Sequence, residues 1–468
     1  MKSIFLNRQT ELERLKKCYN SDHFEMVVIW GRRRIGKTQI IIKSLENRRC
    51  ITCTGLKTSP ENNLKNLSDA FFSVLMPGLP HPSFSSYKDL FDYLNHTHAF
   101  LSEEYIIVLD EYPFLSGPED ELSSILQYSI DHYWSNTKLK LVLCGSSLSF
   151  MKDRVLSGDS PLYARTTLSL EIRKFMLWEM KAYEWGYSNE ETAILYSVLG
   201  GIPRYLNMVD PLKSMKDNLY ELFFESGALL SGEADSLLNE EFKETARYSD
   251  VLGVIAAGKS SINDIAEAVG MQTGTVSFYL TSMIKVGLIK KEVPFGSKNN
   301  KKSIYTIVDG LFRFHYQFVR PNINMINFGK GDAVLNISVL PSIPRYMGLE
   351  WEQICMNYMY ASFNPERDHF IYSDLSRWWG GNSKTKKQSE IDMMSVSGNQ
   401  ALFGECKWTD DKVGSIVLDT LIERCEQFDY PEKHWYLFSK SGFTEELIIK
   451  AERQNNIHLI DLTDVFSL

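Results

Sequence analysis

The stretch EMVVIWGRRRIGKTQIIIKSL, residues 25–45, joins a strand pattern to a helix pattern through a glycine-rich turn. Residues 26–30 form a short apolar run of the strand type, and a helical pattern follows the turn. The turn itself has the spacing G-x-x-x-x-G-K-[ST], formed by Gly31, Gly36, Lys37 and Thr38. Because the mechanism of this loop requires a strand before it and a helix after it, the stretch predicts a site for nucleotide phosphates.

The residue types of this loop suit phosphate chemistry. Its glycines let the backbone curl so that N–H groups point at phosphate oxygens, and the following helix adds its positive N-terminal end. Lys37 is expected to reach the β- and γ-phosphates of ATP, and Thr38 is expected to ligate Mg²⁺. We expect the whole loop to contact the nucleotide: Gly31, Arg32, Arg33, Arg34, Ile35, Gly36, Lys37, Thr38 and Gln39.

Two further strand-like runs end in polar residues. The apolar run at residues 105–109 leads to Asp110 and Glu111, at the carboxyl end where ligands of doubly wound sheets bind. We expect Asp110 to hold Mg²⁺ through water and Glu111 to polarise the attacking water. The run at residues 138–147 contains Ser146 near its end, placed to hydrogen-bond the γ-phosphate or the water. A plain serine turn after a strand is the alternative for Ser146.

The bulk composition is that of an ordinary globular protein. The 468 residues carry a formal net charge of −8, so any nucleic-acid contact must come from a local patch. The seven scattered cysteines favour reduced thiols in the cytoplasm over a disulfide framework. The N-terminus lacks an apolar signal core, and no run reaches the roughly 18 apolar residues of a membrane helix. We therefore expect a soluble, cytoplasmic protein with no membrane partner.

Five segments occur in an order that carries a family resemblance. They are FLNRQTELERL (5–15), GRRRIGKT (31–38), VLDEYPFL (108–115), LCGSSLSFM (143–151) and LGGIPRYL (199–206). In this order they resemble the archaeal-type AAA ATPases of the STAND group, and the resemblance extends over nearly the whole chain.

The resemblance implies roles for residues outside the loop. Asn7 and Arg8 would line the adenine site, and Pro203 would belong to a helical lid over the nucleotide. In the segment SPLYARTT, Ala164 stands where the family often has glycine, whereas Arg165 is retained. Arg165 is a candidate arginine finger, with an ordinary surface arginine as the alternative.

The middle of the chain predicts two helical modules. Residues 166–245 have apolar residues near helical spacing, which indicates a helical lid. In residues 246–325, two apolar helix faces precede a strand hairpin, which indicates a winged helix-turn-helix. The first face is formed by Ile262, Ile265, Ala266 and Val269, and the second by Val276, Leu280 and Ile284.

This second module would offer polar and basic groups to DNA. Its second helix would present Thr273, Thr275, Ser277 and Lys285. The hairpin carries lysines that would meet phosphates: Lys290, Lys291, Lys298, Lys301 and Lys302. The alternative is a protein-contact module whose hairpin lysines are merely solvated.

Residues 335–468 alternate helix and strand signals and predict a small α/β domain. Residues 390–397 and 400–408 are strand candidates. The dipeptide Gly398-Asn399 between them is a two-residue hairpin signal. The domain therefore contains a predicted antiparallel hairpin.

The hairpin turn sets which residues face each other. If Gly398-Asn399 is the turn, opposite residues have numbers that sum to 797, and Asp392 lies opposite Glu405. Period-two alternation adds Lys407 to the same face. A one-residue slip of the register would move Asp392 to the other face.

These three residues suit metal-assisted hydrolysis of a phosphodiester. Two neighbouring carboxylates can share a Mg²⁺, and a lysine can orient the metal-bound water and stabilise the developing charge. The order Asp, spacer, Glu-x-Lys resembles the PD-(D/E)xK nucleases, with Ile391 in place of the usual proline. That resemblance adds Glu352 as a third acid, with Glu350 as the alternative. A cross-strand salt-bridge patch without activity is the alternative for the whole site.

Together these patterns predict an α/β protein with a P-loop NTPase core of the AAA type at residues 1–165. The lid, the winged helix and a restriction-endonuclease-like domain would follow. We expect an ATPase that uses ATP and Mg²⁺, binds DNA according to its nucleotide state and cleaves DNA with its C-terminal domain. A regulatory switch, or a signalling scaffold that forms homo-oligomers on ATP, is the alternative.

Overall fold

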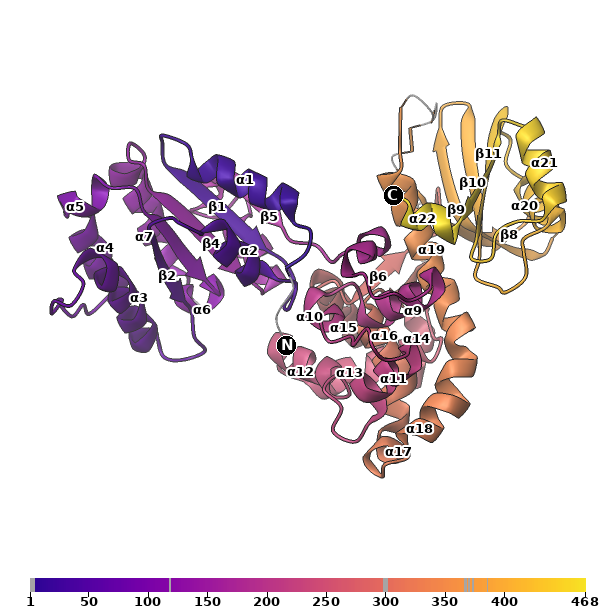
Figure 1. Cartoon of the computed structure of the whole chain (residues 1–468), viewed down its shortest axis with the longest axis horizontal. Helices are drawn as coiled ribbons and strands as arrows, with labels where there is room; N and C mark the ends of the chain where they lie inside the picture. The colour runs from indigo at the N-terminus through magenta and orange to yellow at the C-terminus, as the bar shows by residue number, and fades with distance from the viewer. Residues whose placement is uncertain are drawn as a thin grey trace. The chain divides into compact units, whose positions relative to one another are not determined.

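The computed structural model describes residues 5–117, 119–297, 302–365, 368, 371–372, 374–384 and 386–468. The chain divides into two compact units, and Figure 1 colours the chain by residue number. The first unit comprises Met1–Lys174 and Ile202–Asn207, and the second comprises Phe175–Gly201 and Met208–Leu468. No helix in the described ranges is both long enough and apolar enough to span a bilayer.

The first unit is built on a parallel sheet with the strand order β2-β3-β4-β1-β5. Its strands are β1 Glu25–Trp30, β2 Cys50–Thr54, β3 Ile106–Asp110, β4 Lys140–Gly145 and β5 Leu168–Glu171. Every residue of β3 and β4 is buried, as their apolar runs predict for strands covered on both faces. The predicted parallel α/β fold of this part of the chain is therefore confirmed.

The helices of the first unit surround this sheet (Figure 1). They are α1 Gln9–Tyr19, α2 Lys37–Ser44, α3 Pro60–Leu75, α4 Tyr87–Asn95, α5 His98–Leu101, α6 Tyr112–Ser116, α7 Glu121–Ser129, η1 Ile130–Trp134, α8 Leu148–Phe150, η2 Met151–Val155, η3 Tyr163–Arg165 and α10 Pro203–Leu206. α1 packs beside α2 and β1, α3 packs on β2, and α4 packs on α7. Trp134 is fully buried among their aromatic side chains, where its indole N–H donates to Asn95 Oδ1.

The domain boundary predicted after residue 165 lies too early. β5 pairs with β1 from Val27–Leu168 to Trp30–Glu171, so it is an edge strand of the same sheet. Only one of its four residues is buried, and this strand therefore lacks the apolar run that marks the central strands. The six residues Ile202–Asn207, predicted as lid, also belong to the first unit.

The second unit begins with helices. They are η4 Leu177–Tyr183, α9 Asn189–Leu199, α11 Met215–Leu219, η5 Tyr220–Phe224, α12 Glu233–Glu241, α13 Thr245–Ala256, α14 Ile262–Val269 and α15 Thr273–Lys285. The antiparallel strands β6 Ile289–Glu292 and β7 Ile304–Ile307 follow. Ile265, Val276 and Leu280 are buried in the core of this part, as predicted. Ile284, predicted on the same face, is 37% exposed, because steps of four residues drift around a helix of 3.6 residues per turn.

A second group of helices leads to the C-terminal domain. It contains α16 Gly310–Phe314, η7 His315–Val319, η8 Arg320–Asn322, α17 Ile323–Asn327, α18 Gly331–Val334, η9 Leu335–Val339, η10 Leu340–Ser342 and α19 Ile343–Ala361. α19 is nineteen residues long and packs against both α9 and the strands of the C-terminal sheet. This one helix therefore connects the helical part of the second unit with its sheet.

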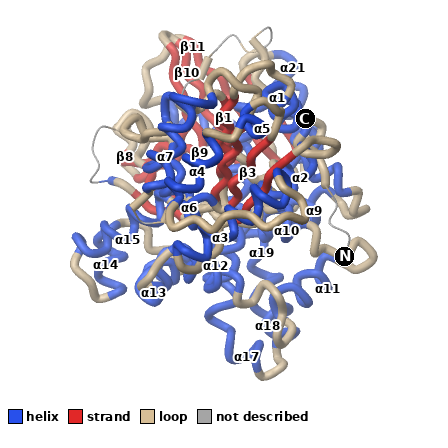
Figure 2. The backbone as a smooth tube through the Cα atoms, turned by 90° about the vertical axis from the view of Figure 1, so that its left-hand side faces the viewer, coloured by secondary structure: helices blue, strands red, loops and turns tan. Residues whose placement is uncertain are grey.

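The C-terminal sheet has the order β12-β11-β10-β9-β8, with β8 and β9 antiparallel to their neighbours. Figures 1 and 2 label β8, β9, β10 and β11 of this sheet. Its strands are β8 Ser376–Gly381, β9 Gln388–Ser397, β10 Gln400–Lys407, β11 Glu432–Ser439 and β12 Ile457–Asp461. The helices are α20 Ser415–Cys425, α21 Glu445–Arg453 and α22 Leu462–Phe466. The predicted small α/β domain is present, with its strands close to the predicted ranges.

The predicted hairpin between β9 and β10 has the predicted turn and register. Gly398 has a φ of 60°, which glycine adopts without strain. The ladder runs from Gln400–Ser397 to Gly404–Met393 and ends one pair short of Glu405 and Asp392. At that point the register between β8 and β9 shifts, as at a β-bulge. The direct cross-strand pair of Asp392 with Glu405 is therefore not part of the ladder. The hairpin signal in the sequence could not predict this, because it carries no information about a bulge between β9 and β8.

Candidate functional site

The glycine-rich loop of the first unit curls around the start of α2. Gly36 has a φ of 94° and Arg34 a φ of 68°, both in the left-handed region. Lys37 is 6% exposed, and its Nζ donates to the carbonyl oxygens of Gly31 and Arg32 at 2.9 Å each. Burial lowers the pKa of this lysine. The ammonium group therefore lies over the loop, where its charge would be compensated by a phosphate.

The side chains of this loop differ in their exposure. Ile35 is 2% exposed and anchors the loop in the core. Thr38 and Gln39 are exposed at the start of α2, and the three arginines, Arg32, Arg33 and Arg34, are partly buried. The loop thus presents polar groups and backbone N–H groups, whereas its one apolar residue holds it in place.

Asp110 and Thr38 meet as predicted for two groups around one cation. Asp110 is the last residue of β3, and its Oδ2 accepts a hydrogen bond from Thr38 Oγ1 at 3.0 Å. Its other oxygen accepts from the backbone N–H of Glu111 at 2.9 Å. The carboxylate is therefore fixed at the carboxyl end of the sheet, beside the phosphate-binding loop.

Glu111 is held by Ser146, the serine that was predicted to contact the nucleotide or the attacking water. Ser146 Oγ donates to both carboxylate oxygens of Glu111, at 2.8 and 2.7 Å. Glu111 itself has a φ of 48°, which turns the chain sharply at the end of β3. The contact of Ser146 with a γ-phosphate stays a prediction, and its present role is to orient the glutamate.

The segment predicted to line the adenine site lies close to the loop. Asn7 and Arg8 have φ values of 56° and 66°. Arg8 is 9% exposed and donates to the carbonyl oxygen of Arg173 at 2.6 Å. The residue before Arg173, Ile172, has its carbonyl oxygen 2.5 Å from where a Cβ on Gly31 would stand. The N-terminal segment and the start of the loop are thus both packed on residues 172–173.

The two remaining predicted residues of this site have different surroundings. Pro203 is the first residue of the short helix α10, which lies in the first unit. Arg165 forms two hydrogen bonds with Asp131, at 2.9 and 2.7 Å, and a third with the carbonyl oxygen of Pro161. These contacts bind Arg165 to its own surface, so its role as an arginine finger stays a prediction.

A second cluster of charged residues lies in the C-terminal domain. Glu405 is 4% exposed and accepts from Lys407 Nζ at 2.6 Å. It also accepts from Arg424 Nη1, at 3.2 and 3.1 Å from its two oxygens. Asp392 Oδ2 accepts from the backbone N–H of Cys406 at 2.9 Å. The predicted residues are therefore close together, and Arg424 on α20 is a member that the strand pattern did not reveal.

Two carboxyl groups of this cluster have pKa values near neutrality. Burial and the charge of Glu405 raise the pKa of Asp392 to about 7. Burial and the charge of Asp392 raise the pKa of Glu352 to about 8. Glu352 also lies 3.3 Å from Arg377 Nε. The three predicted acids thus influence one another, and each of Glu352 and Glu405 has a basic partner.

Glu350, the alternative third acid, takes part in a different contact. Its carboxylate lies 2.9 Å from Arg313 Nη2, and both side chains are less than a tenth exposed. Arg313 in turn donates to the carbonyl oxygen of Tyr346. Glu350 therefore forms a buried structural ion pair with Arg313 and is not the third acid of the cluster. Among the described residues, no group of three or more His, Cys, Asp and Glu side chains is arranged to hold a metal ion.

Comparison with known proteins agrees with the geometry of the first site. Residues 5–209 match an ATPase domain found predominantly in Archaea, and residues 315–417 match a family described as archaeal and bacterial proteins of unknown function. An uncharacterized protein of Methanocaldococcus jannaschii is 31% identical over 468 residues, which cover 98% of this chain and 100% of that protein. The chain belongs to this archaeal-type ATPase family.

Two further similarities concern the ATPase domain and the fold. An uncharacterized ATP-binding protein of M. jannaschii is 44% identical over 46 residues, which are 10% of this chain and 78% of that protein. The Walker-type ATPase of Pyrococcus abyssi has 20% identity and a TM-score of 0.51, covering 67% of this chain and 96% of that one. This second likeness shows a shared fold. The protein is an ATPase.

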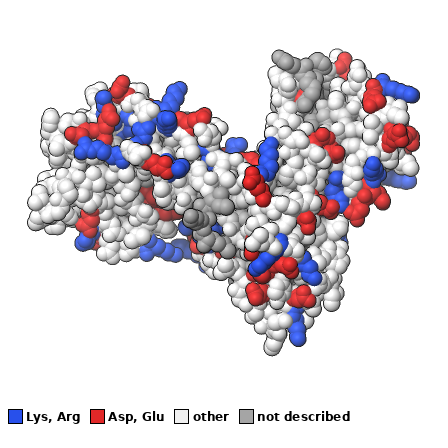
Figure 3. Space-filling view, in the orientation of Figure 1, with Lys and Arg blue, Asp and Glu red and all other residues white. Residues whose placement is uncertain are grey.

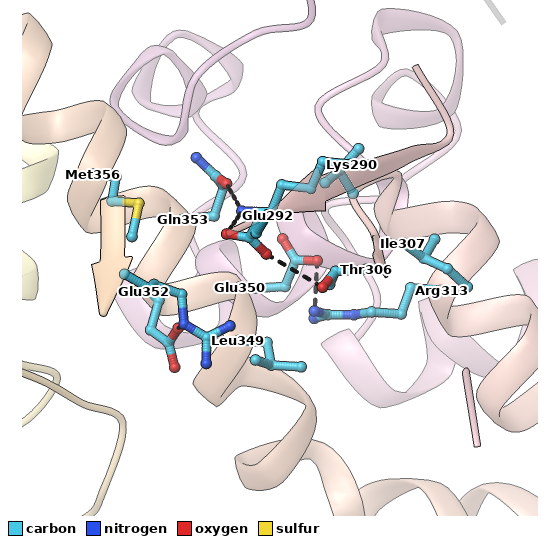
Figure 4. Close-up of a pocket in the computed structure, with 12 residues that line it drawn as sticks. Lys290, Glu292, Thr306, Ile307, Arg313, Leu349, Glu350, Glu352, Gln353 and Met356 are labelled. Atoms are coloured by element: carbon cyan, nitrogen blue, oxygen red, sulfur yellow. Dashed lines mark hydrogen bonds and ion pairs between the residues drawn. The ribbon is translucent and has the colours of Figure 1, made fainter. Parts of the chain in front are cut away.

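A small pocket separates the hairpin of this ATPase from α19 (Figure 4). Lys290 on β6 donates to Gln353 Oε1 at 3.0 Å and lies 2.8 Å from Glu292. After β6, the backbone N–H of Phe295 donates to the carbonyl oxygen of Arg377 at 2.8 Å. The hairpin is thus docked on the C-terminal domain.

This docking corrects one predicted contact of the hairpin. Lys290 was expected to meet phosphates, but its ammonium group donates a hydrogen bond to Gln353 on α19 across the pocket. Lys291 and Lys302 are exposed. Lys298 and Lys301 lie outside the described residues.

Proposed function

We propose that this ATPase changes its engagement with DNA according to its nucleotide state, and that its C-terminal cluster cleaves phosphodiester bonds with Mg²⁺. The observation that carries the proposal is the meeting of Asp392, Glu405 and Lys407, which the ATPase activity does not require. These residues lie in a buried cluster of a domain separate from the loop that binds ATP.

The ATP site has suitable groups for Mg²⁺. Thr38 Oγ1 and Asp110 Oδ2 are hard oxygen donors 3.0 Å apart at the end of β3. They would hold the ion, which neutralises charge on the β- and γ-phosphates. Glu111, oriented by Ser146, would polarise the attacking water. Asn7 and Arg8 would contact the adenine, as in the STAND ATPases that the sequence resembles, and Pro203 would contact the nucleotide from α10 of the first unit.

The C-terminal cluster has the donor chemistry of a metal site, although its acids are not arranged around a common point in the described part of the chain. Asp392 and Glu405 supply carboxylate oxygens, and Glu352 adds a third acid whose pKa is raised by burial and by the charge of Asp392. A divalent ion bound there would supply Lewis acidity and an activated water. Lys407 would then stabilise negative charge on the phosphate. For this, Arg424 must share Glu405 with the ion or release it.

The second candidate function is a switch without cleavage. Arg424 and Lys407 already neutralise Glu405, and Arg377 pairs with Glu352. A salt-bridge cluster of this kind would hold the domain together or contact a phosphate backbone without any metal. The ATPase would then act as a nucleotide-controlled regulator or scaffold, which assembles as a homo-oligomer if Arg165 reaches the site of a neighbouring copy.

DNA contact is proposed through α14, α15 and the hairpin, which we interpret as a winged helix-turn-helix. Thr273, Thr275, Ser277 and Lys285 are exposed on α15, as that role requires. In the view of Figure 3, basic side chains are interspersed with acidic ones, so the contact would be local. Because Lys290 is occupied by α19, the phosphate contacts would fall to the other lysines of the hairpin.

Supercoiled plasmid separates the two candidates. With Mg²⁺ or Mn²⁺ and ATP, the proposal predicts nicking by the wild type and none by Asp392→Asn or Lys407→Ala. Asp411→Asn, an exposed carboxylate of the same domain, is the matched control and should nick normally. If the wild type never nicks plasmid but shifts DNA in a gel at low salt, cleavage is excluded and the switch without cleavage is supported. No shift at low salt would also remove DNA as the partner.

A further inference from the structure

A tyrosine outside the predicted site contacts the loop that binds ATP. Arg34 Nη1 donates to Tyr205 Oη at 3.1 Å, across 171 residues of sequence. Tyr205 is 2% exposed and lies in α10, inside the first unit. Its backbone N–H donates to the carbonyl oxygen of Ile202 at 2.9 Å, so the turn of α10 fixes its position. A rigid hydroxyl group is thus presented to the side chain of a loop residue.

The loop residue that Tyr205 contacts has an unusual backbone conformation. Arg34 has a φ of 68°, which side chains other than glycine seldom adopt. Such a conformation persists where the surroundings hold it. A left-handed residue in a turn also aims successive backbone N–H groups toward one side, which is how backbone nests bind anions. The backbone conformation at Arg34 therefore helps to set the direction of the N–H groups that the loop offers to phosphates.

We infer that Tyr205 is a positioning residue of the ATPase site, which fixes Arg34 and through it the phosphate-binding conformation of the loop. It acts through Arg34 and does not need to touch the nucleotide. The backbone N–H groups of the loop contact phosphates in the ground state and in the transition state alike. Loss of the hydroxyl is therefore expected to weaken ATP binding and to leave the chemical step unchanged.

The position of Tyr205 in the chain adds a consequence. Its segment, Ile202–Asn207, belongs to the first unit, while the residues on both sides of it belong to the second. Gly200 and Gly201 precede it, with φ values of 68° and 67°. Tyr205 thus links the conformation of the loop to the point where the chain enters the first unit.

Tyr205→Phe removes the hydroxyl and keeps the buried ring. The expected result is a KM for ATP raised about fivefold or more, with kcat within about twofold of the wild type. Tyr87→Phe is the matched control, because Tyr87 lies in the same unit and its hydroxyl donates to the carbonyl oxygen of Leu115 at 3.0 Å. Its KM should stay that of the wild type. An unchanged KM in Tyr205→Phe, or a fall in kcat alone, would overturn the inference.

A double-mutant cycle tests whether the effect runs through Arg34. Arg34→Gln should raise KM by itself, and Tyr205→Phe should add less than about twofold in that background. If Tyr205→Phe multiplies KM by the same factor in both backgrounds, Tyr205 does not act through Arg34. If Tyr205→Phe does not fold, Arg34→Gln alone decides, since an unchanged KM for that variant also contradicts the inference.

Discussion

At the scale of single residues, the acidic cluster is where pH should act on the protein. The pKa of Glu352 is raised to about 8 and that of Asp392 to about 7, mainly by burial. A carboxyl group with a raised pKa binds its proton more tightly in the folded state than in the unfolded one. Its favourable contribution is complete below pH about 4 and is lost as pH rises through the folded-state value.

Glu352→Gln should therefore stabilise the protein above pH 8, by on the order of 1–3 kcal/mol, because Arg377 keeps Glu390 as a counter-charge. The measurement is the midpoint of thermal unfolding at pH 6 and pH 8.5 for the wild type and the variant. Between pH 6 and pH 8.5 the unfolding midpoint of the wild type should fall by more than that of Glu352→Gln. The exposed Glu445→Gln should behave like the wild type at both values. Equal pH dependence of all three proteins would contradict the raised pKa of Glu352.

Glu350, two residues away, should respond in the opposite way. Its carboxylate forms a buried ion pair with Arg313, so Glu350→Gln leaves a buried guanidinium without its counter-charge. Breaking such a pair from one side costs about 3–5 kcal/mol. Urea unfolding of Glu350→Gln and Glu352→Gln at pH 8.5 should show destabilisation and stabilisation respectively. The same sign for both variants would mean that the two glutamates do not have the distinct surroundings described above.

Elements differ in how far their sequences predict them. The central strands and the glycine-rich loop are readable because burial on both faces needs an apolar run and phosphate binding needs fixed spacing. β5 is missed because an edge strand buries only one residue in its middle. The register of β9 and β10 follows from the turn at Gly398, whereas the shift beside Asp392 depends on packing with β8, which is distant in sequence. Arg424 is missed for the same reason, because only folding brings α20 over Glu405.

Helices α16 and α9 are in close contact because a glycine lies between them. A Cβ on Gly310 would stand 1.9 Å from the carbonyl oxygen of Ser197. Gly310→Ala should therefore destabilise the protein by about 2 kcal/mol or more, since two helices must move apart. Gly348→Ala is the control in α19, where a Cβ would have no neighbour within 4 Å.

The control variant Gly348→Ala also has a predicted effect on the free energy of unfolding. Alanine is preferred over glycine inside a helix by about 1 kcal/mol, so Gly348→Ala should leave the protein as stable as the wild type or more so. Urea unfolding measures both variants. A Gly310→Ala protein as stable as Gly348→Ala would show that α9 and α16 are not in close contact.

At the scale of the whole molecule, the chain joins an ATPase unit to a second unit that ends in the acidic cluster. The M. jannaschii relative matches over its full length, so the two parts occur together in this family. The residues proposed for the ATP site all lie in the first unit, and those of the acidic cluster all lie in the second. ATP hydrolysis and the proposed cleavage would therefore depend on two separable sets of residues.

The most direct test measures ATP turnover and plasmid nicking on the same preparations of three proteins. Asp392→Asn should hydrolyse ATP at the wild-type rate and fail to nick plasmid, because its side chain lies outside the ATP site. Lys37→Ala should fail to hydrolyse ATP, because it loses the ammonium group that serves the phosphates. If Asp392→Asn nicks plasmid as the wild type does, or if the wild type does not nick at all, the central claim about the C-terminal cluster is contradicted.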